Sequence, residues 1–168
     1  LEAIFNASPI GIVVTSLGKQ PRITKVNDTL LQLFGYPRET LIGRSSADLN
    51  MWADPRERDH LFQAVEQDQE VEMEAWRLRA DGGRFLAAHT ARTYTDASGQ
   101  DQFAVIVLRD ITELRRIEDE IRHLNTDLER RVEEARRHLE DTARRRAAAE
   151  TAHHQAADAL ARLADDPG

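Results

Sequence analysis

The stretch Gln102–Glu113, QFAVIVLRDITE, joins two physically different parts of this 168-residue chain. Its apolar run Phe103–Leu108 has the length of a buried strand and falls far short of the ~20 residues needed to cross a bilayer. Asp110 and Thr112 are residue types that cap helices, and Asp110 with Glu113 has the spacing of a capping pair. Residues 113–165 contain no glycine or proline. The stretch therefore predicts a strand that passes directly into a long helix.

Composition divides the chain at the same place. All nine aromatic residues and seven of the eight glycines precede residue 113, whereas 25 of the last 56 residues are charged. We therefore expect a globular domain at residues 1–112 and a helix at residues 113–166. The absence of cysteine excludes disulfides, thiolate metal sites and cysteine nucleophiles. The net charge of −7 without a basic patch argues against nucleic acid as the main partner.

The same sequence features bear on the cellular compartment of the protein. The chain has no membrane segment and no signal peptide in its sequence pattern, and its lack of cysteine fits a reducing compartment. It begins at Leu1 without a methionine. We therefore expect a cytoplasmic fragment of a larger protein.

The first 112 residues alternate turns, short strands and short helices. Sheet segments joined by tight turns predict an antiparallel sheet with helices on one side, an α+β fold. Within the third strand Val71, Met73 and Ala75 alternate, but Trp76 falls out of phase, so a β-bulge is expected there. The five predicted strands are Gly11–Ser16, Ile23–Val26, Glu70–Ala80, Phe85–Thr95 and Gln102–Arg109.

The helical segment carries an apolar stripe at heptad spacing. One extra four-residue step between Leu128 and Val132 is a stutter, and the stripe weakens through residues 142–156. A single helix cannot bury such a stripe, so we expect a parallel coiled-coil homodimer. The seam residues are Leu114, Ile117, Ile121, Leu124, Leu128, Val132, Ala135, Leu139, Leu160 and Leu163.

Several short motifs, taken in order, resemble those of PAS domains over the whole of residues 1–112. The resemblance implies a five-stranded antiparallel sheet cupped by helices over a small-ligand pocket. It also implies that Asp110, Ile111 and Thr112 transfer a signal from the last strand to an output helix. The motifs are Ile4–Ile12, Val26–Asp28, Leu33–Tyr36, Leu41–Arg44, Trp52–Pro55, Asp81–Gly82 and Arg109–Glu113.

The helix resembles the linker of bacterial sensor histidine kinases, through Ile121–Asn125 and Leu128–Glu134. This resemblance implies a sensory module of a two-component system that relays ligand or partner state to an output domain and is not itself an enzyme. Two alternatives stay open. The domain is a PAS dimerisation module without a ligand, or it is the input module of a diguanylate cyclase or phosphodiesterase.

Candidate pocket residues are Leu31, Phe34, Val65 and Trp76, each weighed against plain core packing. His60 lies in the helix that supplies the iron ligand in haem-binding PAS sensors, but its neighbours do not match their pattern. Adduct-forming flavin chemistry is excluded because the chain has no cysteine. No cofactor is required, and neither haem nor flavin is favoured. His89 is expected to be a satisfied strand histidine.

His153 and His154 raise the question of histidine phosphorylation. The residues that follow, Gln155–Asp158, lack the acidic, Arg, Pro and Leu continuation of a kinase phosphoacceptor. The heptad register places His153 inward, which favours a core histidine that loosens the coiled coil. No metal-spaced cluster is present in the sequence, so no metal site is predicted.

Overall fold

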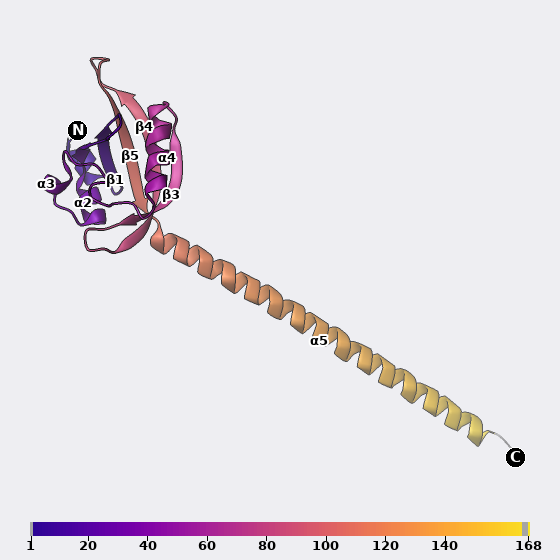
Figure 1. The fold of residues 1–168 in the computed structure, drawn as a ribbon. Helices are drawn as coiled ribbons and strands as arrows, with labels where there is room; N and C mark the ends of the chain where they lie inside the picture. Colours follow the sequence, from indigo (N-terminus) through magenta and orange to yellow (C-terminus); the bar gives the residue numbers. More distant parts are fainter. Residues whose placement is uncertain (1, 166–167) are drawn as a thin grey trace. The chain divides into compact units, whose positions relative to one another are not determined.

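An antiparallel sheet with the strand order β2-β1-β5-β4-β3 organises the first part of the computed structural model (Figure 1). The structure describes residues 2–165 and residue 168. It divides into two compact units, Leu1–Arg116 and Ile117–Gly168. The predicted five-stranded antiparallel α+β fold is confirmed. The strands are β1 (Gly11–Ser16), β2 (Ile23–Val26), β3 (Val71–Leu78), β4 (Arg84–Thr95) and β5 (Gln102–Asp110).

Four short helices belong to the first unit. They are α1 (Glu2–Ala7), α2 (Asp28–Phe34), α3 (Arg38–Leu41) and α4 (Pro55–Glu66). Helix α2 packs against β1, and α4 packs against β3 and β4 (Figure 1). Gly35 ends α2 in the left-handed conformation, with φ of 74°, where a side chain would be strained. The apolar core lies between these helices and the sheet.

The inward face of β3 differs from the expectation. Its pairing with β4 is continuous from Val71 to Leu78, so the predicted bulge is wrong. Strict alternation instead places Arg77 in the interior, where it is 4% exposed, and turns Trp76 outward, where it is 37% exposed. The guanidinium of Arg84 lies 4.7 Å from the centroid of the Trp76 ring. A buried arginine thus occupies an inward-facing position of β3.

Asn27 ties three elements together from a fully buried position. Its Oδ1 accepts hydrogen bonds from the backbone N–H groups of Ile12 (2.8 Å) and Leu30 (3.1 Å). Its Nδ2 donates to the carbonyl oxygens of Phe5 (3.1 Å) and Ile10 (2.8 Å). The side chain therefore caps α2 and also fixes the ends of α1 and β1.

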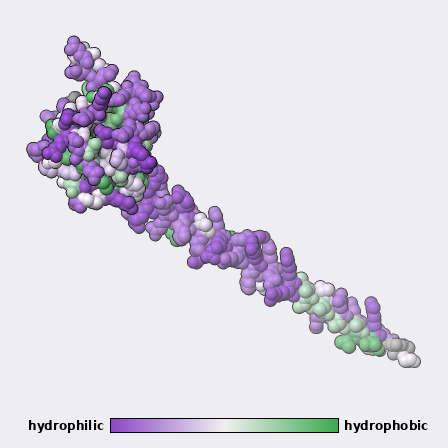
Figure 2. All heavy atoms as spheres, viewed as in Figure 1, coloured by the Kyte–Doolittle hydropathy of each residue, from purple (hydrophilic) through white to green (hydrophobic). Residues whose placement is uncertain are grey.

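Helix α5 (Thr112–Ala164) has 53 residues, which at 1.5 Å per residue is about 80 Å. Its large apolar seam residues are exposed in the single chain, from 42% for Ile117 to 73% for Leu163. The visible face of α5 is mostly hydrophilic, with a hydrophobic stretch toward its C-terminal end (Figure 2). Among the described residues, no helix is both long and apolar enough to span a membrane.

Ion pairs between residues three and four apart stabilise α5 within one chain. Hydrogen bonds from Arg136 and Arg137 lower the pKa of Glu133 to about 2. The pairs include Glu113–Arg116, Asp119–Arg122, Asp127–Arg130, Arg130–Glu134, Arg136–Glu140, Asp141–Arg145 and Arg146–Glu150.

Replacing Asn27 tests its role as the tie between α1, β1 and α2. Asn27→Ala leaves two N–H groups and two carbonyl groups without partners, so we expect the free energy of unfolding to fall by about 3 kcal/mol. Urea unfolding followed by circular dichroism measures the change. Asn125→Ala, on the exposed surface of α5, is the control and should change the value by less than about 0.5 kcal/mol. Equal effects of the two substitutions would contradict the assignment.

Candidate functional site: a small cavity and the sheet-to-helix junction

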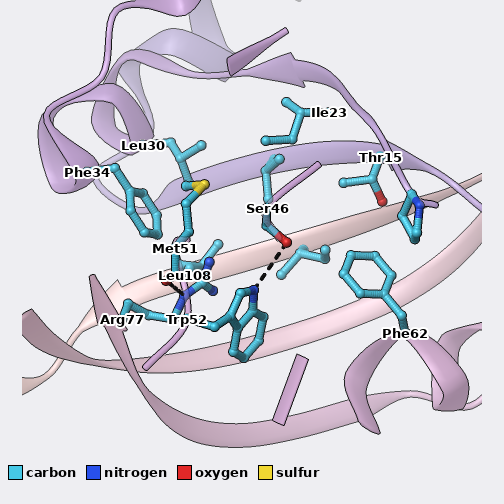
Figure 3. A pocket seen from close by; sticks show the side chains of 13 residues that line it. Thr15, Ile23, Leu30, Phe34, Ser46, Met51, Trp52, Phe62, Arg77 and Leu108 are labelled. Carbon is cyan, nitrogen blue, oxygen red and sulfur yellow. Dashed lines mark hydrogen bonds between the residues drawn. The ribbon is translucent and has the colours of Figure 1, made fainter. Parts of the chain in front are cut away.

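A cavity of about 30 Å³ lies inside the first unit (Figure 3). Pockets for organic ligands typically measure ~300–1,000 Å³, and one water needs roughly 10–15 Å³. Side chains therefore fill most of the space, and what remains has room for about two to three water-sized groups. Most of the wall is apolar, and its polar members are Thr15, Ser46 and Arg77, together with the indole N–H of Trp52.

Arg77 provides the one charge on this wall. Its Nε donates to the carbonyl oxygen of Met51 at 2.8 Å, and its Nη1 lies 2.7 Å from Nε2 of His89. The guanidinium carbon is 3.9 Å from the centroid of the Trp52 ring and 4.9 Å from that of Phe34. Trp52 also stacks on the imidazole of His89, with ring centroids 5.2 Å apart. The cation is thus held by aromatic faces, a carbonyl and an imidazole.

Burial changes the protonation equilibria of this pair. Desolvation lowers the pKa of Arg77 to about 9, so the guanidinium stays charged at neutral pH. Desolvation and the neighbouring Arg77 cation lower the pKa of His89 to about 3. His89 is therefore neutral at physiological pH, and its Nε2 accepts a hydrogen bond from an N–H group of Arg77. Among the described residues, no carboxylate forms an ion pair with Arg77.

Two hydroxyl groups complete the polar wall. Ser46 Oγ accepts hydrogen bonds from Nε1 of Trp52 and from Nε of Arg58, each at 3.2 Å. Thr15 Oγ1 is buried and has no hydrogen-bond partner within the described part of the chain. Figure 3 shows Thr15 and Ser46 facing Trp52 and Phe62 across the cavity.

The structure brings only one of the sequence-predicted pocket residues to this cavity. Phe34 lines it, whereas Val65 is buried elsewhere in the core and Leu31 packs at the edge of the core. Trp76 faces outward and His60 is exposed on α4, so neither contributes to the wall. An exposed imidazole does not offer a haem ligand inside the domain. No group of His, Asp and Glu in the described residues could hold a metal ion.

Sequence reasoning missed Arg77, Ser46 and Thr15. The signal for Arg77 was available, because Val71, Met73 and Ala75 set a two-residue period that leads to residue 77. Nothing in the local sequence distinguishes Ser46 or Thr15 from other hydroxyl residues, because their role follows from the packing of distant segments.

The junction between β5 and α5 is the second feature of the site. Asp110 Oδ1 accepts from the backbone N–H of Thr112 (3.0 Å) and from its hydroxyl (2.6 Å). The Thr112 oxygen in turn accepts from the backbone N–H of Leu86 (2.9 Å), and the N–H of Ile111 donates to the Leu86 carbonyl oxygen (2.9 Å). Asp110, Ile111 and Thr112 are therefore bonded to the neighbouring strand β4 as well as to each other.

Arg79, which directly follows β3, extends this junction. Its Nη2 forms an ion pair with Oδ2 of Asp110 at 2.8 Å, and its Nη1 donates to the carbonyl oxygen of Leu33 in α2. Burial alone would raise the pKa of Asp110, but the hydrogen bonds from Thr112 and Arg79 outweigh burial and hold it below its ordinary value. Sequence reasoning missed Arg79, since an arginine after a strand is unremarkable without its partners. Glu113 pairs with Arg116.

The histidines considered as phosphoacceptors lie on α5. His153 and His154 are both exposed in the single chain, and His154 Nε2 is 4.0 Å from a carboxylate oxygen of Asp158. The predicted inward position of His153 in a coiled coil stays a prediction.

His89 gives the fold a defined pH dependence. The pKa of His89 falls from 6.5 in the unfolded chain to about 3 in the folded chain, so the unfolded chain takes up a proton first on acidification. Its contribution to stability is complete above pH 6.5 and is lost as the pH falls toward 3. Between these limits we expect a slope of about 1.4 kcal/mol per pH unit from this residue.

Urea unfolding at pH 7 and pH 5 measures this contribution. His89→Gln keeps an acceptor for Arg77 and removes the titration, so the difference between the two pH values should be about 2 kcal/mol smaller than in the parent. His123→Gln, on exposed α5, is the control. An identical pH dependence in the parent and His89→Gln would refute the buried, neutral state of His89.

Comparisons with known proteins agree with the fold. Residues 9–113 match the PAS domain family. A search among curated proteins finds no match. Among solved structures, an RNA-binding light-oxygen-voltage receptor aligns with a TM-score of 0.62 and 20% identity, over 74% of this chain and 36% of that receptor. The chain therefore spans well under two thirds of the receptor's length.

Two further structures align over nearly their whole length. The light-oxygen-voltage domain of a blue-light activated histidine kinase from Erythrobacter litoralis has a TM-score of 0.55 and 23% identity, over 62% of this chain and 98% of that one. A PAS domain from Colwellia psychrerythraea has a TM-score of 0.55 and 26% identity, over 66% of this chain and 93% of that one. With the family match covering most of the chain and the sheet order and junction described above, the chain belongs to the PAS domain family.

Proposed function

We propose that this chain is the sensory and relay module of a cytoplasmic signalling protein. In this proposal the PAS domain at residues 1–112 sets the state of a homodimeric coiled coil at residues 113–166, which passes it to an output domain. Residue 166 lies outside the described residues. The observation that carries the proposal is the hydrogen-bonded junction of Asp110 and Thr112, which attaches the start of α5 to β4 and to Arg79.

The junction supports a relay because it has little freedom to move independently of the sheet. Two backbone hydrogen-bonding groups of Leu86 are engaged by Ile111 and Thr112, so a displacement of β4 moves the first turn of α5. Arg115 adds an ion pair to Glu74 of β3. Energetic coupling between sites travels through contiguous contacts of this kind when the element they reach has two arrangements. The stutter near Leu128 and the weak stretch 142–156 supply the candidate second register.

The exposed stripe of α5 supports the homodimer. Large apolar side chains at heptad spacing stay exposed to water when the helix forms alone. Full burial of each one stabilises the protein by about 1.5–3 kcal/mol. A second copy offers the same stripe at the same height, which is what a parallel arrangement requires. The charged residues that form the intrahelical ion pairs lie outside this stripe, and its seam positions from Leu114 to Leu139 carry no charge.

For the output domain we propose a histidine kinase. The resemblance of Ile121–Asn125 and Leu128–Glu134 to kinase linkers supports it, as does the similar fold of the light-oxygen-voltage domain of a blue-light activated histidine kinase from Erythrobacter litoralis. The other output considered is a diguanylate cyclase or phosphodiesterase. Residues 153–158 lack the phosphoacceptor continuation, so we place the phosphorylated histidine of such a kinase outside this chain.

A second candidate function is a PAS dimerisation module that binds no ligand. The size of the cavity favours it, because about 30 Å³ does not admit an organic ligand of ordinary size. In that case the stimulus reaches the domain through a protein partner, and the junction and coiled coil keep the roles given above.

Cross-linking tests the parallel seam, and the cysteine-free chain makes single-cysteine variants simple. In a parallel dimer each seam residue faces its own copy, so Ile121→Cys and Leu128→Cys should form disulfide-linked dimers in nearly full yield under mild oxidation. Non-reducing electrophoresis measures the yield. The matched control is Thr126→Cys on the opposite face of α5, which should remain mostly monomeric on the gel.

Two results would contradict the proposed seam. Equal yields at the seam and control positions would show that α5 does not pair through this stripe. Replacing Ile121, Leu124 and Leu128 together by Asn should leave a folded monomer in analytical ultracentrifugation, and a persistent dimer would contradict the seam assignment in the same way.

Hydrogen exchange tests the junction. Asp110→Ala removes the acceptor for the Thr112 N–H and the partner of Arg79, so amide exchange in residues 112–116 should accelerate by at least about tenfold, which corresponds to roughly 1.4 kcal/mol of local stability. Exchange in the centre of β1 should not change. Asp101→Ala, in the exposed turn before β5, is the control. Unchanged exchange at residues 112–116 in Asp110→Ala would remove the junction as the carrier of the relay.

A further inference from the structure

The cavity inside the PAS domain has an imbalance of charge. Its wall includes the buried guanidinium of Arg77, and no Asp or Glu is among the described residues that line it. The acidic group that acts on Arg77 electrostatically is Glu57, which forms no ion pair with it. Burying a charge is costly unless a partner of opposite sign or good hydrogen bonds compensate. The protein supplies aromatic faces, a carbonyl and an imidazole here, but no anion.

The wall also holds more hydrogen-bond donors than acceptors. A guanidinium has five N–H donors, and Arg77 uses two of them, on Met51 and His89. Ser46 Oγ already accepts from Trp52 and Arg58, so its own proton is available to an acceptor. Thr15 Oγ1 is buried without a partner. A group that fits this cavity best is therefore an acceptor that carries negative charge.

The volume limits the size of that group. About 30 Å³ accommodates roughly two to three water-sized groups, since one water needs ~10–15 Å³. Two acceptor oxygens on one small, flat centre match both this volume and the fork of N–H groups that arginine presents to carboxylates and related oxyanions. The faces of Trp52 and Phe34, which flank the guanidinium, favour a flat ligand in its plane.

We propose that this cavity binds a small planar oxyanion of three or four non-hydrogen atoms, of the class of formate, bicarbonate or nitrate, through the free N–H groups of Arg77 and the hydroxyls of Ser46 and Thr15. This inference rests on the proposed sensory function and names the ligand class of its site. Binding neutralises the buried cation and gives Thr15 and Ser46 a common acceptor. The result is a tighter connection between β1, β3 and the segment of Ser46 and Trp52.

The two tryptophans provide a direct test in the 168-residue chain. The Trp52 indole N–H is bonded to Ser46 on the cavity wall, whereas Trp76 lies on the outer face of β3. In ¹⁵N-labelled protein, titration with sodium formate, bicarbonate or nitrate should shift the Trp52 indole signal saturably and leave the Trp76 signal in place. Sodium gluconate, whose anion exceeds the cavity, holds the ionic strength constant. The three anions serve as separate arms that identify the ligand.

Matched variants assign the binding. Arg77→Met removes the charge at similar length and should weaken binding at least tenfold, and Thr15→Val removes the unpartnered hydroxyl without changing the shape and should weaken it about threefold to tenfold. Arg84→Met, beside Trp76, is the control and should leave the affinity unchanged. If Arg77→Met fails to fold, Thr15→Val alone decides whether the anion binds in this cavity.

Three outcomes overturn the proposal: no saturable shift of Trp52 with any of the three anions, equal shifts of both indole signals, or an affinity that neither Arg77→Met nor Thr15→Val changes. Seam cross-linking in the same preparation separates this result from the relay. Anion binding without cross-linking would support the proposed ligand class and contradict the coiled-coil relay. Cross-linking without anion binding removes the ligand class alone.

Discussion

The guanidinium of Arg77 is the constraint around which the PAS domain is arranged. It is a buried cation that forms no ion pair with a carboxylate in the described part of the chain, so hydrogen bonds and aromatic contacts have to compensate its charge. Met51 gives a carbonyl oxygen, His89 gives a neutral imidazole nitrogen, and Trp52 gives an aromatic face. These partners come from β4 and from the segment before α4, which Arg77 thereby fixes to β3. The low pKa of His89 follows from the same arrangement, since a second cation beside Arg77 is strongly disfavoured.

Arg77 and Arg79 together connect the cavity to the helix junction through the end of α2. Arg77 lies over the ring of Phe34, and Arg79 donates to the carbonyl oxygen of Leu33 while it pairs with Asp110. The N–H of Ala80 donates to the Phe34 carbonyl oxygen as well. A few direct contacts therefore link the Arg77 guanidinium to Asp110, and in the proposed relay these contacts carry a displacement from one to the other. Each step of this path is a named hydrogen bond, ion pair or ring contact, and coupling along it requires an element with two arrangements.

Local sequence predicted the elements well because their signals are local. Turn residues and alternation defined β1 and β2 to the residue. The predicted start of α5 at residue 113 is one residue from Thr112, whereas the predicted end at residue 166 lies outside the described residues and beyond Ala164. The β3 facing failed for a different reason. Hydrophobicity suggested that Trp76 is inside, whereas strand alternation turns it outward and puts Arg77 inside. Whether residue 76 or residue 77 is buried depends on the contacts that Arg77 makes with Met51, Trp52 and His89. These groups come together only in the folded domain. The same holds for the cavity, whose wall comes from separate stretches of the chain.

Helix α5 has two kinds of surface residue, charged residues that form ion pairs within the helix and an apolar stripe. Its ion pairs are formed within one chain, so they stabilise the helix and say nothing about the choice of partner. In the proposed dimer, association then depends on the apolar stripe alone. The free energy of pairing is therefore most favourable where that stripe is continuous. Residues 114–139 contribute large side chains at almost every seam position, while residues 142–156 place Thr142, Arg146 and His153 there. In the proposed dimer we therefore expect firm pairing along residues 114–139 and weak pairing along residues 142–156. In this proposal, a small rotation imposed at Asp110 moves residues 114–139 as one unit, and the change of register takes place in residues 142–156, where two registers are expected to differ least in energy.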